Sequence, residues 1–273
     1  MLKVAIMYDV DQTLSPNYMQ EYSLLPMLNV NPSTFWKNCN DFAIEHNMDG
    51  NLGYMFKILE RAKEQNISIK YQDLKDQGKH IKFFAGMEEY FGNINKYANN
   101  LGLEIDHYVI SSGLKEMIEG TSIAHNFKRI FASRFAYDEN DVAFWPAQNV
   151  NFTTKTQYIF RIKKEKIDNL HNEKEVNAYI ADKSTVLPYT RMLYLGDGFT
   201  DIPCFKVIKD KKGTAICVYN EELLQSKKDA EKIIADGRVN FIAPADYREG
   251  SRLYNILCDS LNKIAADAKL NQY

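Results

Sequence analysis

Five short apolar runs constrain the fold of this chain more strongly than any single motif. The runs contain five or six residues each, and apolar and polar positions do not alternate cleanly within them. A strand that is buried on both faces lacks such alternation, and parallel strands are usually buried in this way. The chain therefore predicts strands of a mainly parallel sheet at residues 3–8, 107–112, 191–196, 214–219 and 240–244.

Helical patterns separate these runs. In residues 88–102, large apolar side chains recur at three- and four-residue intervals, and Gly102 stands where a helix can end. Residues 250–270 show a second long helical pattern. Strands that alternate with helices are typical of α/β proteins, so we predict an α/β fold.

A long insertion interrupts this alternation. About ninety residues separate the first two runs, which is too many for a simple crossover between parallel strands. We predict that residues 15–83 form a small, mainly helical cap domain that covers one end of the sheet. The core would then consist of residues 1–14 and 84–273.

Two amphipathic helices are expected within this insertion. Residues 31–46 would form the first helix, with Ser33 or Thr34 as its N-cap, and residues 51–65 would form the second. We expect the apolar faces of these helices to pack together or onto the core. The predicted faces contain Phe35, Trp36, Cys39, Phe42 and Ala43 in the first helix, and Leu52, Met55, Phe56, Leu59 and Ala62 in the second.

The composition of the 273 residues excludes several classes of protein. The formal net charge is −2, so no basic excess points to nucleic acid or to an anionic membrane as a partner. No apolar stretch approaches the ~18 residues of a membrane span. The four cysteines contain no C-x-x-C pair and the five histidines no H-x-x-x-H pair, which argues against zinc. We expect a cytoplasmic protein with buried, reduced cysteines, and the oligomeric state stays open.

Polar residues collect where three of the predicted strands end. Open α/β sheets bind ligands outside the carboxyl ends of their strands. Carboxylates that lie close together repel each other unless a cation lies between them. Each group alone also suits an ordinary turn, so their joint occurrence carries the argument. The residues are Asp9, Asp11, Ser111, Ser112, Gly113, Asp197 and Asp201.

The order of these residues resembles the haloacid dehalogenase-like (HAD) superfamily of phosphohydrolases. The matching segments are DVDQT (9–13), VISSG (109–113), Lys155 and GDGFTD (196–201). The helical insertion after the first motif, and the segment at 130–144, resemble the phosphoserine phosphatase-like branch with its helical C1-type cap. The resemblance implies a Rossmannoid three-layer α/β/α core and Mg²⁺ as the cofactor.

The resemblance also assigns chemical roles to the motif residues. Asp9 would be the nucleophile that forms an aspartyl-phosphate, and Asp11 would protonate the leaving oxygen and then activate water. Mg²⁺ prefers hard oxygen ligands and would be bound by Asp9, Asp197 and the backbone carbonyl of Asp11. Asp201 would lie in the metal shell or directly behind it. The phosphoryl group would be bound by Ser111, Ser112, Gly113 and Lys155, of which Ser111 and Lys155 would take part in catalysis.

Two positions depart from the pattern of this branch. Lys155 lies further before Asp197 than in compact members, so other lysines are alternatives for the phosphate site. We favour Lys155 because it follows a predicted strand at 149–152 and threonines that could cap the next helix. The acidic residue at the cap entrance of phosphoserine phosphatases has no secure counterpart, since Glu21 lies near it but out of register. The alternative lysines are Lys163, Lys164, Lys174 and Lys183.

The sequence thus predicts a phosphatase that hydrolyses a small soluble phosphorylated metabolite. Two alternatives stay open, namely a module that binds such a metabolite without turnover, and a phosphotransferase. Asp11 favours hydrolysis, because members of the family that transfer or dehalogenate commonly lack the second aspartate. Aromatic residues of the insertion are expected mainly in the packing of its helices, with a base-stacking pocket as the alternative.

Overall fold

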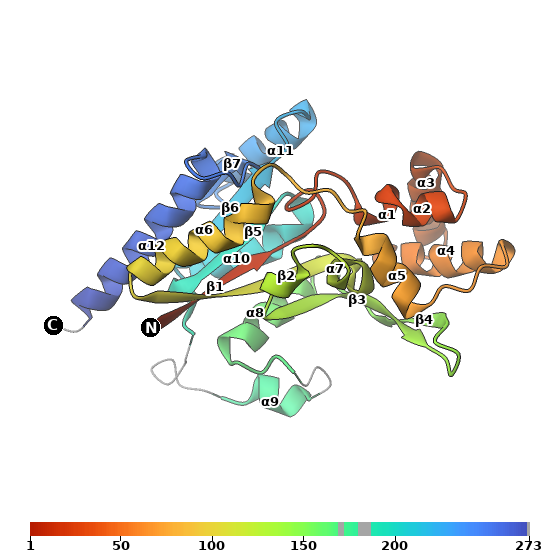
Figure 1. The fold of residues 1–273 in the computed structure, drawn as a ribbon, viewed down its shortest axis with the longest axis horizontal. Helices are drawn as coiled ribbons and strands as arrows, with labels where there is room; N and C mark the ends of the chain where they lie inside the picture. The colour runs from red at the N-terminus through yellow and green to blue at the C-terminus, as the bar shows by residue number, and fades with distance from the viewer. Residues whose placement is uncertain (169–171, 180–186, 272–273) are drawn as a thin grey trace.

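A seven-stranded sheet forms the centre of the computed structural model, which describes residues 1–168, 172–179 and 187–271 (Figure 1). The strand order is β4-β3-β2-β1-β5-β6-β7, and every neighbouring pair is parallel except β3 with β4. The prediction of a mainly parallel sheet is therefore confirmed. The strands are β1 (Leu2–Tyr8), β2 (Leu103–Leu114), β3 (Arg129–Tyr137), β4 (Ala143–Gln148), β5 (Met192–Gly196), β6 (Thr214–Tyr219) and β7 (Phe241–Pro244).

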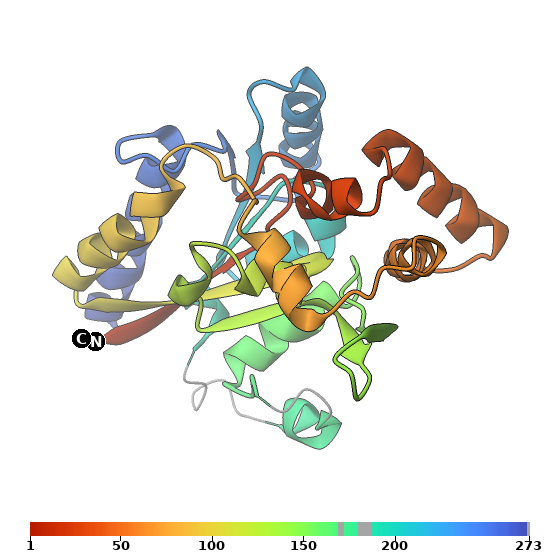
Figure 2. The same ribbon diagram turned by 45° about the vertical axis from the view of Figure 1, so that its right-hand side comes forward.

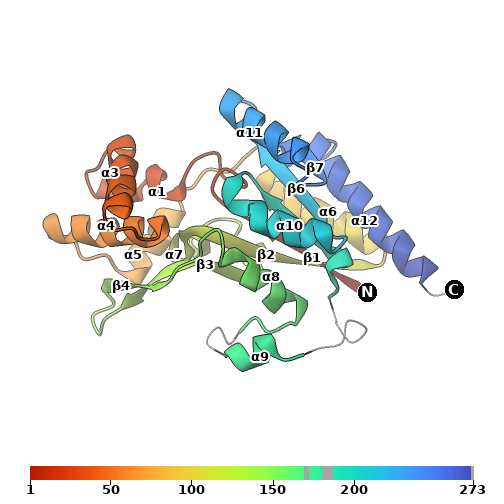
Figure 3. The ribbon, with the colours of Figure 1, turned by 180° about the vertical axis from the view of Figure 1, so that it is seen from behind.

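Helices cover both faces of the sheet, as the lack of alternation in the strands predicted. In β1, Val4 and Ile6 pack on one face, whereas Ala5 and Met7 pack on the other, and all four are fully buried. Figure 1 shows α6 and α12 over the first face, and Figure 3 shows the helices of the second face. The three-layer α/β/α core is thus confirmed. These helices are α6 (Met87–Asn100) and α12 (Arg252–Leu270) on the first face, and α8 (Lys155–Lys163), α10 (Ile202–Asp210) and α11 (Leu224–Ala235) on the second.

Five further helices are grouped on one side of the sheet (Figures 1 and 2). We call α1–α5 the helical group. Asn31 is the N-cap of α3, and its side chain accepts a hydrogen bond from Thr34 N, so the predicted cap at Ser33 or Thr34 is wrong. Asn31 takes the N-cap position because Pro32, which has no N–H, suits the first helical position directly after it. The helices are α1 (Met19–Tyr22), α2 (Leu24–Met27), α3 (Pro32–Glu45), α4 (Gly50–Glu64) and α5 (Tyr71–Gly78).

The faces of α3 and α4 agree with the sequence only in part. Phe35 and Cys39 are buried, as is Met55 of α4. Phe56 was expected on the packed face but is 41% exposed. Its ring instead stacks on Phe42, with centroids 5.2 Å apart and planes within 7° of parallel. The two rings therefore pack against each other at the surface and do not pack onto the core.

Two segments of the core differ from expectation. Residues 149–152, predicted as a strand, form a turn that leads into α8. The strand lies just before it, as β4, at the edge of the sheet and antiparallel to β3. Asn151 causes the difference, because its side chain accepts hydrogen bonds from Thr153 N and Thr154 N and so favours a turn. The remaining short helices are α7 (Lys115–Glu119) and α9 (Glu173–Asn177).

Other expectations about the chain hold in the part that the structure describes. Cys39, Cys204, Cys217 and Cys258 are free and buried. None of the helices at 1–168, 172–179 and 187–271 is both long and apolar enough to cross a membrane. Gly102 follows α6 with a φ of 75°, in the left-handed region expected of a glycine at a helix end.

A close backbone contact joins the helical group to the core. A Cβ atom at Gly78 in α5 would lie 1.9 Å from the carbonyl oxygen of Met117 in α7. A Cβ at Gly120, directly after α7, would lie 1.8 Å from the carbonyl oxygen of Lys75 in α5. Both neighbours are backbone atoms, so the two helices approach this closely only because both positions are glycine.

We expect Gly78→Ala to lower the free energy of unfolding by about 1–3 kcal/mol, because the added methyl group must push α5 and α7 apart. Chemical denaturation followed by circular dichroism measures the change. Gly92→Ala is the matched control, since Gly92 lies within α6 and its Cβ would meet nothing within 4 Å. That control should gain about 0.5–1 kcal/mol from the higher helix propensity of alanine. Equal effects of the two substitutions would contradict the contact.

Candidate functional site

The register of three strands brings the motif residues to one edge of the sheet. Tyr8, the last residue of β1, pairs with Val109 of β2 on one side and with Leu195 of β5 on the other. The backbone N–H of Asp9 continues this pairing by donating to Leu195 O at 3.0 Å. The residues that follow these strands therefore lie around Asp9, in the position that open α/β sheets use for ligands.

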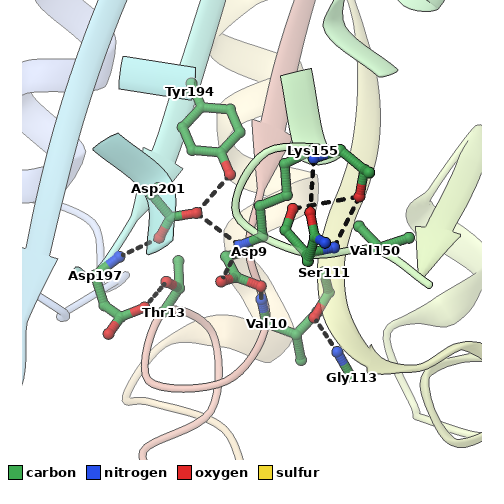
Figure 4. A network of polar contacts seen from close by, with 12 residues as sticks. Asp9, Val10, Thr13, Ser111, Gly113, Val150, Lys155, Tyr194, Asp197 and Asp201 are labelled. Atoms are coloured by element: carbon green, nitrogen blue, oxygen red, sulfur yellow. Dashed lines mark hydrogen bonds and ion pairs between the residues drawn. The ribbon is translucent and has the colours of Figure 1, made fainter. Parts of the chain in front are cut away.

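A buried lysine connects two of the aspartates (Figure 4). Lys155 Nζ donates to Asp9 Oδ2 at 2.6 Å and to Asp201 Oδ1 at 2.7 Å, and the lysine side chain is fully buried. Burial alone would lower the pKa of Lys155, but the charges and hydrogen bonds of Asp201 and Asp9 outweigh it and raise the pKa. Lys155 is therefore held in its charged form.

The turn before α8 places this lysine. Asn151 accepts hydrogen bonds from two backbone N–H groups through its side chain, and its carbonyl accepts one from Lys155 N at 2.9 Å. The alternative lysines do not reach Asp9. Lys163 lies over the ring of Tyr189, Lys164 bonds to backbone carbonyls near α9, and Lys174 is exposed. Lys183 lies outside the described residues.

Asp201 is braced from three directions. Besides Lys155, it accepts hydrogen bonds from Tyr194 OH at 2.7 Å and from Asp197 N at 3.2 Å. It lies against Gly196, where a Cβ atom would come within 2.3 Å of Asp201 Oδ2. The first glycine of GDGFTD is thus required by the position of the last aspartate of the same motif.

Three carboxylates form a group that could hold a metal ion. Oxygen atoms of Asp9, Asp197 and Asp201 all lie within 4.8 Å of one another. In the described part of the chain, Lys155 is the ammonium that bonds to this group, so three carboxylates face one cation. Burial, together with the charges of Asp201 and Asp9, raises the pKa of Asp197 well above its usual value. Hard oxygens and uncompensated negative charge are what Mg²⁺ requires, so the residues fit this ion.

Asp11 stands apart from the carboxylate group. Its Oδ1 accepts a hydrogen bond from the backbone N–H of Met19, at the start of α1, at 2.8 Å. Burial and the charge of Asp9 raise the pKa of Asp11 well above its usual value. A carboxyl group of this kind retains a proton at a pH where an exposed aspartate has lost it.

The S-S-G residues of the second motif lie on the other side of Asp9 (Figure 4). Ser111 is fully buried, and its Oγ accepts a hydrogen bond from Gly113 N at 3.1 Å. The carbonyl of Ser112 accepts one from Tyr54 OH in α4 at 2.7 Å. The loop that carries Ser111 is therefore fixed both by its own turn and by the helical group.

One cavity connects the two parts of the molecule. It has a volume of about 600 Å³ and is bounded by the core on one side and by Tyr18, α3 and α4 on the other. Asp9, Asp11, Ser111, Ser112 and Asp197 line it, whereas Lys155 and Asp201 are buried behind them. The structure thus assembles the predicted residues at the bottom of a single cavity.

Comparison with known proteins identifies the architecture. No protein-family model matches the chain. A phosphoserine phosphatase in its apo form matches 90% of this chain and 96% of its own, with 16% identity and a TM-score of 0.57. A phospho-aspartyl intermediate analogue of a phosphoserine phosphatase matches 94% and 98%, with 16% identity and a TM-score of 0.53. The chain has the HAD-like fold.

Two further relatives complete this comparison. A HAD family hydrolase from Salmonella enterica serovar Typhi matches 78% of this chain and 62% of its own, with 16% identity and a TM-score of 0.52. A protein of Borreliella burgdorferi, described only as uncharacterized, is 24% identical over 94% of this chain and 96% of its own. The two phosphoserine phosphatase structures match 90% and 94% of this chain, so the HAD-like fold extends over nearly the whole chain.

Several residues at this site were not predicted. Tyr194 carries no motif, although it shares a strand face with Gly196 and so could have been placed near Asp201 by alternation. Asp49, before α4, accepts hydrogen bonds from the side chains of Asn149 at 2.9 Å and Asn151 at 2.7 Å. Asn51 donates in turn to Val150 O at 2.8 Å. Nothing local signals these contacts, because about a hundred residues separate the partners.

The raised pKa of Asp197 predicts that the free energy of unfolding of the metal-free protein depends on pH. Above about pH 4 the unfolded chain releases a proton that the folded protein retains, so stability falls as the pH rises towards the folded pKa. Asparagine has no such proton. With a chelator present, we expect Asp197→Asn to be more stable than the wild type at pH 8, and the difference to shrink towards pH 4. Thermal unfolding midpoints across this range measure it, and a difference that does not vary with pH would contradict the cause.

Proposed function

We propose that the protein is a Mg²⁺-dependent phosphomonoester hydrolase that acts through an aspartyl-phosphate. The observation that carries this proposal is the pairing of two unlike aspartates at the bottom of one cavity. Burial raises the pKa of both carboxyl groups, but a buried ammonium opposes the rise at Asp9, whereas Asp11 is held by a backbone N–H and its pKa lies well above its usual value. A nucleophile and a proton donor are thereby placed two residues apart.

In the first step, the Asp9 carboxylate attacks phosphorus and the bond between phosphorus and the alcohol oxygen breaks. The electron pair of that bond leaves with the alcohol oxygen, which takes the proton held by Asp11. The hydrogen bond from Met19 N occupies Asp11 Oδ1, so Oδ2 is suited to carry the proton. The helical group, through Met19, would therefore orient the acid.

In the second step, Asp11 acts as the base. Water attacks phosphorus of the aspartyl-phosphate and gives its proton to the Asp11 carboxylate, and the bond to Asp9 breaks to release inorganic phosphate. Lys155 stays charged throughout, so it offsets negative charge on Asp9 and on the transferring group. Ser111 would hydrogen-bond a phosphoryl oxygen, with Ser112 and Gly113 shaping its loop.

Mg²⁺, when bound, supplies positive charge that lets an anionic nucleophile approach an anionic ester. Asp9 and Asp197 would hold it directly, together with the backbone carbonyl of Asp11. The oxygens of Asp201 already accept hydrogen bonds from Lys155, Tyr194 and Asp197 N. We therefore place Asp201 behind the metal, where it orients Lys155 and Asp197.

The substrate is proposed to be a small soluble metabolite. The helical group covers the cavity and so favours a compact ester over a protein or a nucleic acid. We place the enzyme in the cytoplasm, with the helical group acting as the cap over the core.

The proposal predicts turnover of a generic aryl phosphate such as p-nitrophenyl phosphate in the presence of Mg²⁺, and its loss on adding a chelator. Asp9→Asn should abolish turnover, and Asp11→Asn should lower kcat by about 10²–10⁴-fold. Asp41→Asn is the matched control, because Asp41 is exposed in α3 and pairs with Lys37. Full activity of Asp9→Asn would refute the mechanism.

A second prediction concerns Gly196, the first glycine of GDGFTD. Gly196→Ala should displace Asp201 from Lys155 and lower kcat at least tenfold, because the added methyl group occupies the place of the carboxylate. Gly92→Ala is the control, since a Cβ there would meet nothing within 4 Å and Gly92 does not line the cavity. Steady-state assays of the two variants, each checked for folding by circular dichroism, decide the matter. Similar activities would show that the position of Asp201 is not required.

A further inference from the structure

Aromatic side chains form part of the lining of the cavity that contains Asp9. Tyr18, Trp36 and Tyr54 come from the helical group, and Phe199 comes from the core. The neutral amides of Asn40 and Asn51 lie on the same wall as Trp36. The phosphoryl group of a bound ester belongs at Asp9, so this wall is what the alcohol part of the ester would meet.

The charges on the cavity wall have one sign. Asp229 lines it from α11, in addition to the aspartates at the bottom. None of the residues given by the structure as lining this cavity is lysine, arginine or histidine. An alcohol that carries a carboxylate would meet no basic side chain among these lining residues and would face carboxylates instead; Lys232, whose Nζ lies 5.8 Å from the ring centroid of Phe199, does not itself line the cavity. A positively charged alcohol would be attracted.

The arrangement of the rings favours a compact group over a flat one. The ring centroids of Tyr18 and Trp36 are 5.2 Å apart with planes tilted by 54°, and those of Trp36 and Tyr54 are 5.9 Å apart at 70°. A planar base stacked between two rings needs roughly 7 Å between parallel faces. These rings touch one another at steep angles, so they offer an angular surface rather than a slot.

The carboxylate of Glu21 strengthens the attraction of the Trp36 ring for a cation. Trp36 Nε1 donates to Glu21 Oε1 at 2.6 Å, which fixes the orientation of the indole. The negative charge at the ring edge polarises the indole and adds to the attraction of its face for a cation. Glu21 is thus a positioning residue, which orients and polarises the indole of Trp36.

We propose that the alcohol part of the substrate carries an ammonium group and no carboxylate, as in phosphoethanolamine or phosphocholine. The inference rests on the proposed phosphatase function and specifies its substrate. The ammonium lies against Trp36 and Tyr18, and the phosphoryl group lies at Asp9. Cation–π contacts and the acidic wall both select for this charge, and the absence of a basic side chain from the described lining selects against phosphoserine.

Two matched pairs of substrates test the charge preference. Phosphocholine is compared with 3,3-dimethylbutyl phosphate, which has the same shape without the charge. Phosphoethanolamine is compared with phosphoserine, which differs by the carboxylate. We expect kcat/KM to favour the first member of each pair by about tenfold or more, because the first pair differs in the cation–π contact and the second in a carboxylate that would face the acidic lining. Equal values within both pairs, or a preference for phosphoserine, would overturn the inference.

Variants of the aromatic wall localise the effect. Trp36→Leu should remove the preference for phosphocholine over its uncharged isostere, and Trp36→Phe should restore part of it. Glu21→Gln keeps an oxygen that accepts the indole N–H but removes the charge, so it should lower kcat/KM for phosphocholine more than for the isostere. Trp145→Leu is the control, because Trp145 is 64% exposed on β4. A preference that survives Trp36→Leu would contradict the assignment.

A binding measurement avoids any dependence on turnover. The chain has two tryptophans, so Trp145→Phe leaves Trp36 as the single indole reporter. In a protein that also carries Asp9→Asn, phosphocholine should change the Trp36 emission at a lower concentration than 3,3-dimethylbutyl phosphate. Hydrolysis of p-nitrophenyl phosphate distinguishes failure of the proposed phosphatase activity from failure of the proposed substrate class. Its absence refutes the phosphatase, whereas its presence without any ammonium preference refutes only the substrate class.

Discussion

The ammonium group of Lys155, buried between Asp9 and Asp201, is the interaction on which the rest of the site depends. Three segments far apart in the chain supply these residues, and they meet because β1 pairs with β5 while the turn before α8 presents the lysine. Removing one partner from such a buried pair costs about 3–5 kcal/mol, because a charge is left without compensation. The same contact thus fixes the fold at this edge and the charge state of the site.

The two aspartates of the first motif show how environment separates identical side chains. Asp9 lies in the carboxylate group beside Lys155, whereas Asp11 turns towards the helical group and is held by Met19 N. One is kept in contact with positive charge and the other is kept away from it. Under the proposed function, this separation lets a single short loop provide both a nucleophile and a proton donor.

Much of the fold was predictable because the deciding signals are local. Buried strands, the helical pattern of α6 and the order of the motif residues are all properties of short segments. The failures arose where distant contacts decide. Asn151 makes 149–152 a turn, and Phe56 finds Phe42 instead of the core. Asp49 carries no local sign of its partners, so no pattern in the sequence could assign it, whereas Tyr194 could have been placed near Asp201 by strand alternation.

The contact of Asp49 with Asn149 and Asn151 has a mechanical consequence. Asn151 both forms the turn before the helix that carries Lys155 and binds Asp49 in front of α4. Any motion that lifts α4 from the core must first break hydrogen bonds made by the turn that aims the lysine. Opening of the cavity and loosening of the contacts around Lys155 would therefore occur together, so under the proposed function an open molecule would also hold its reacting groups less firmly. The chain would rebuild its reaction geometry each time that it closes.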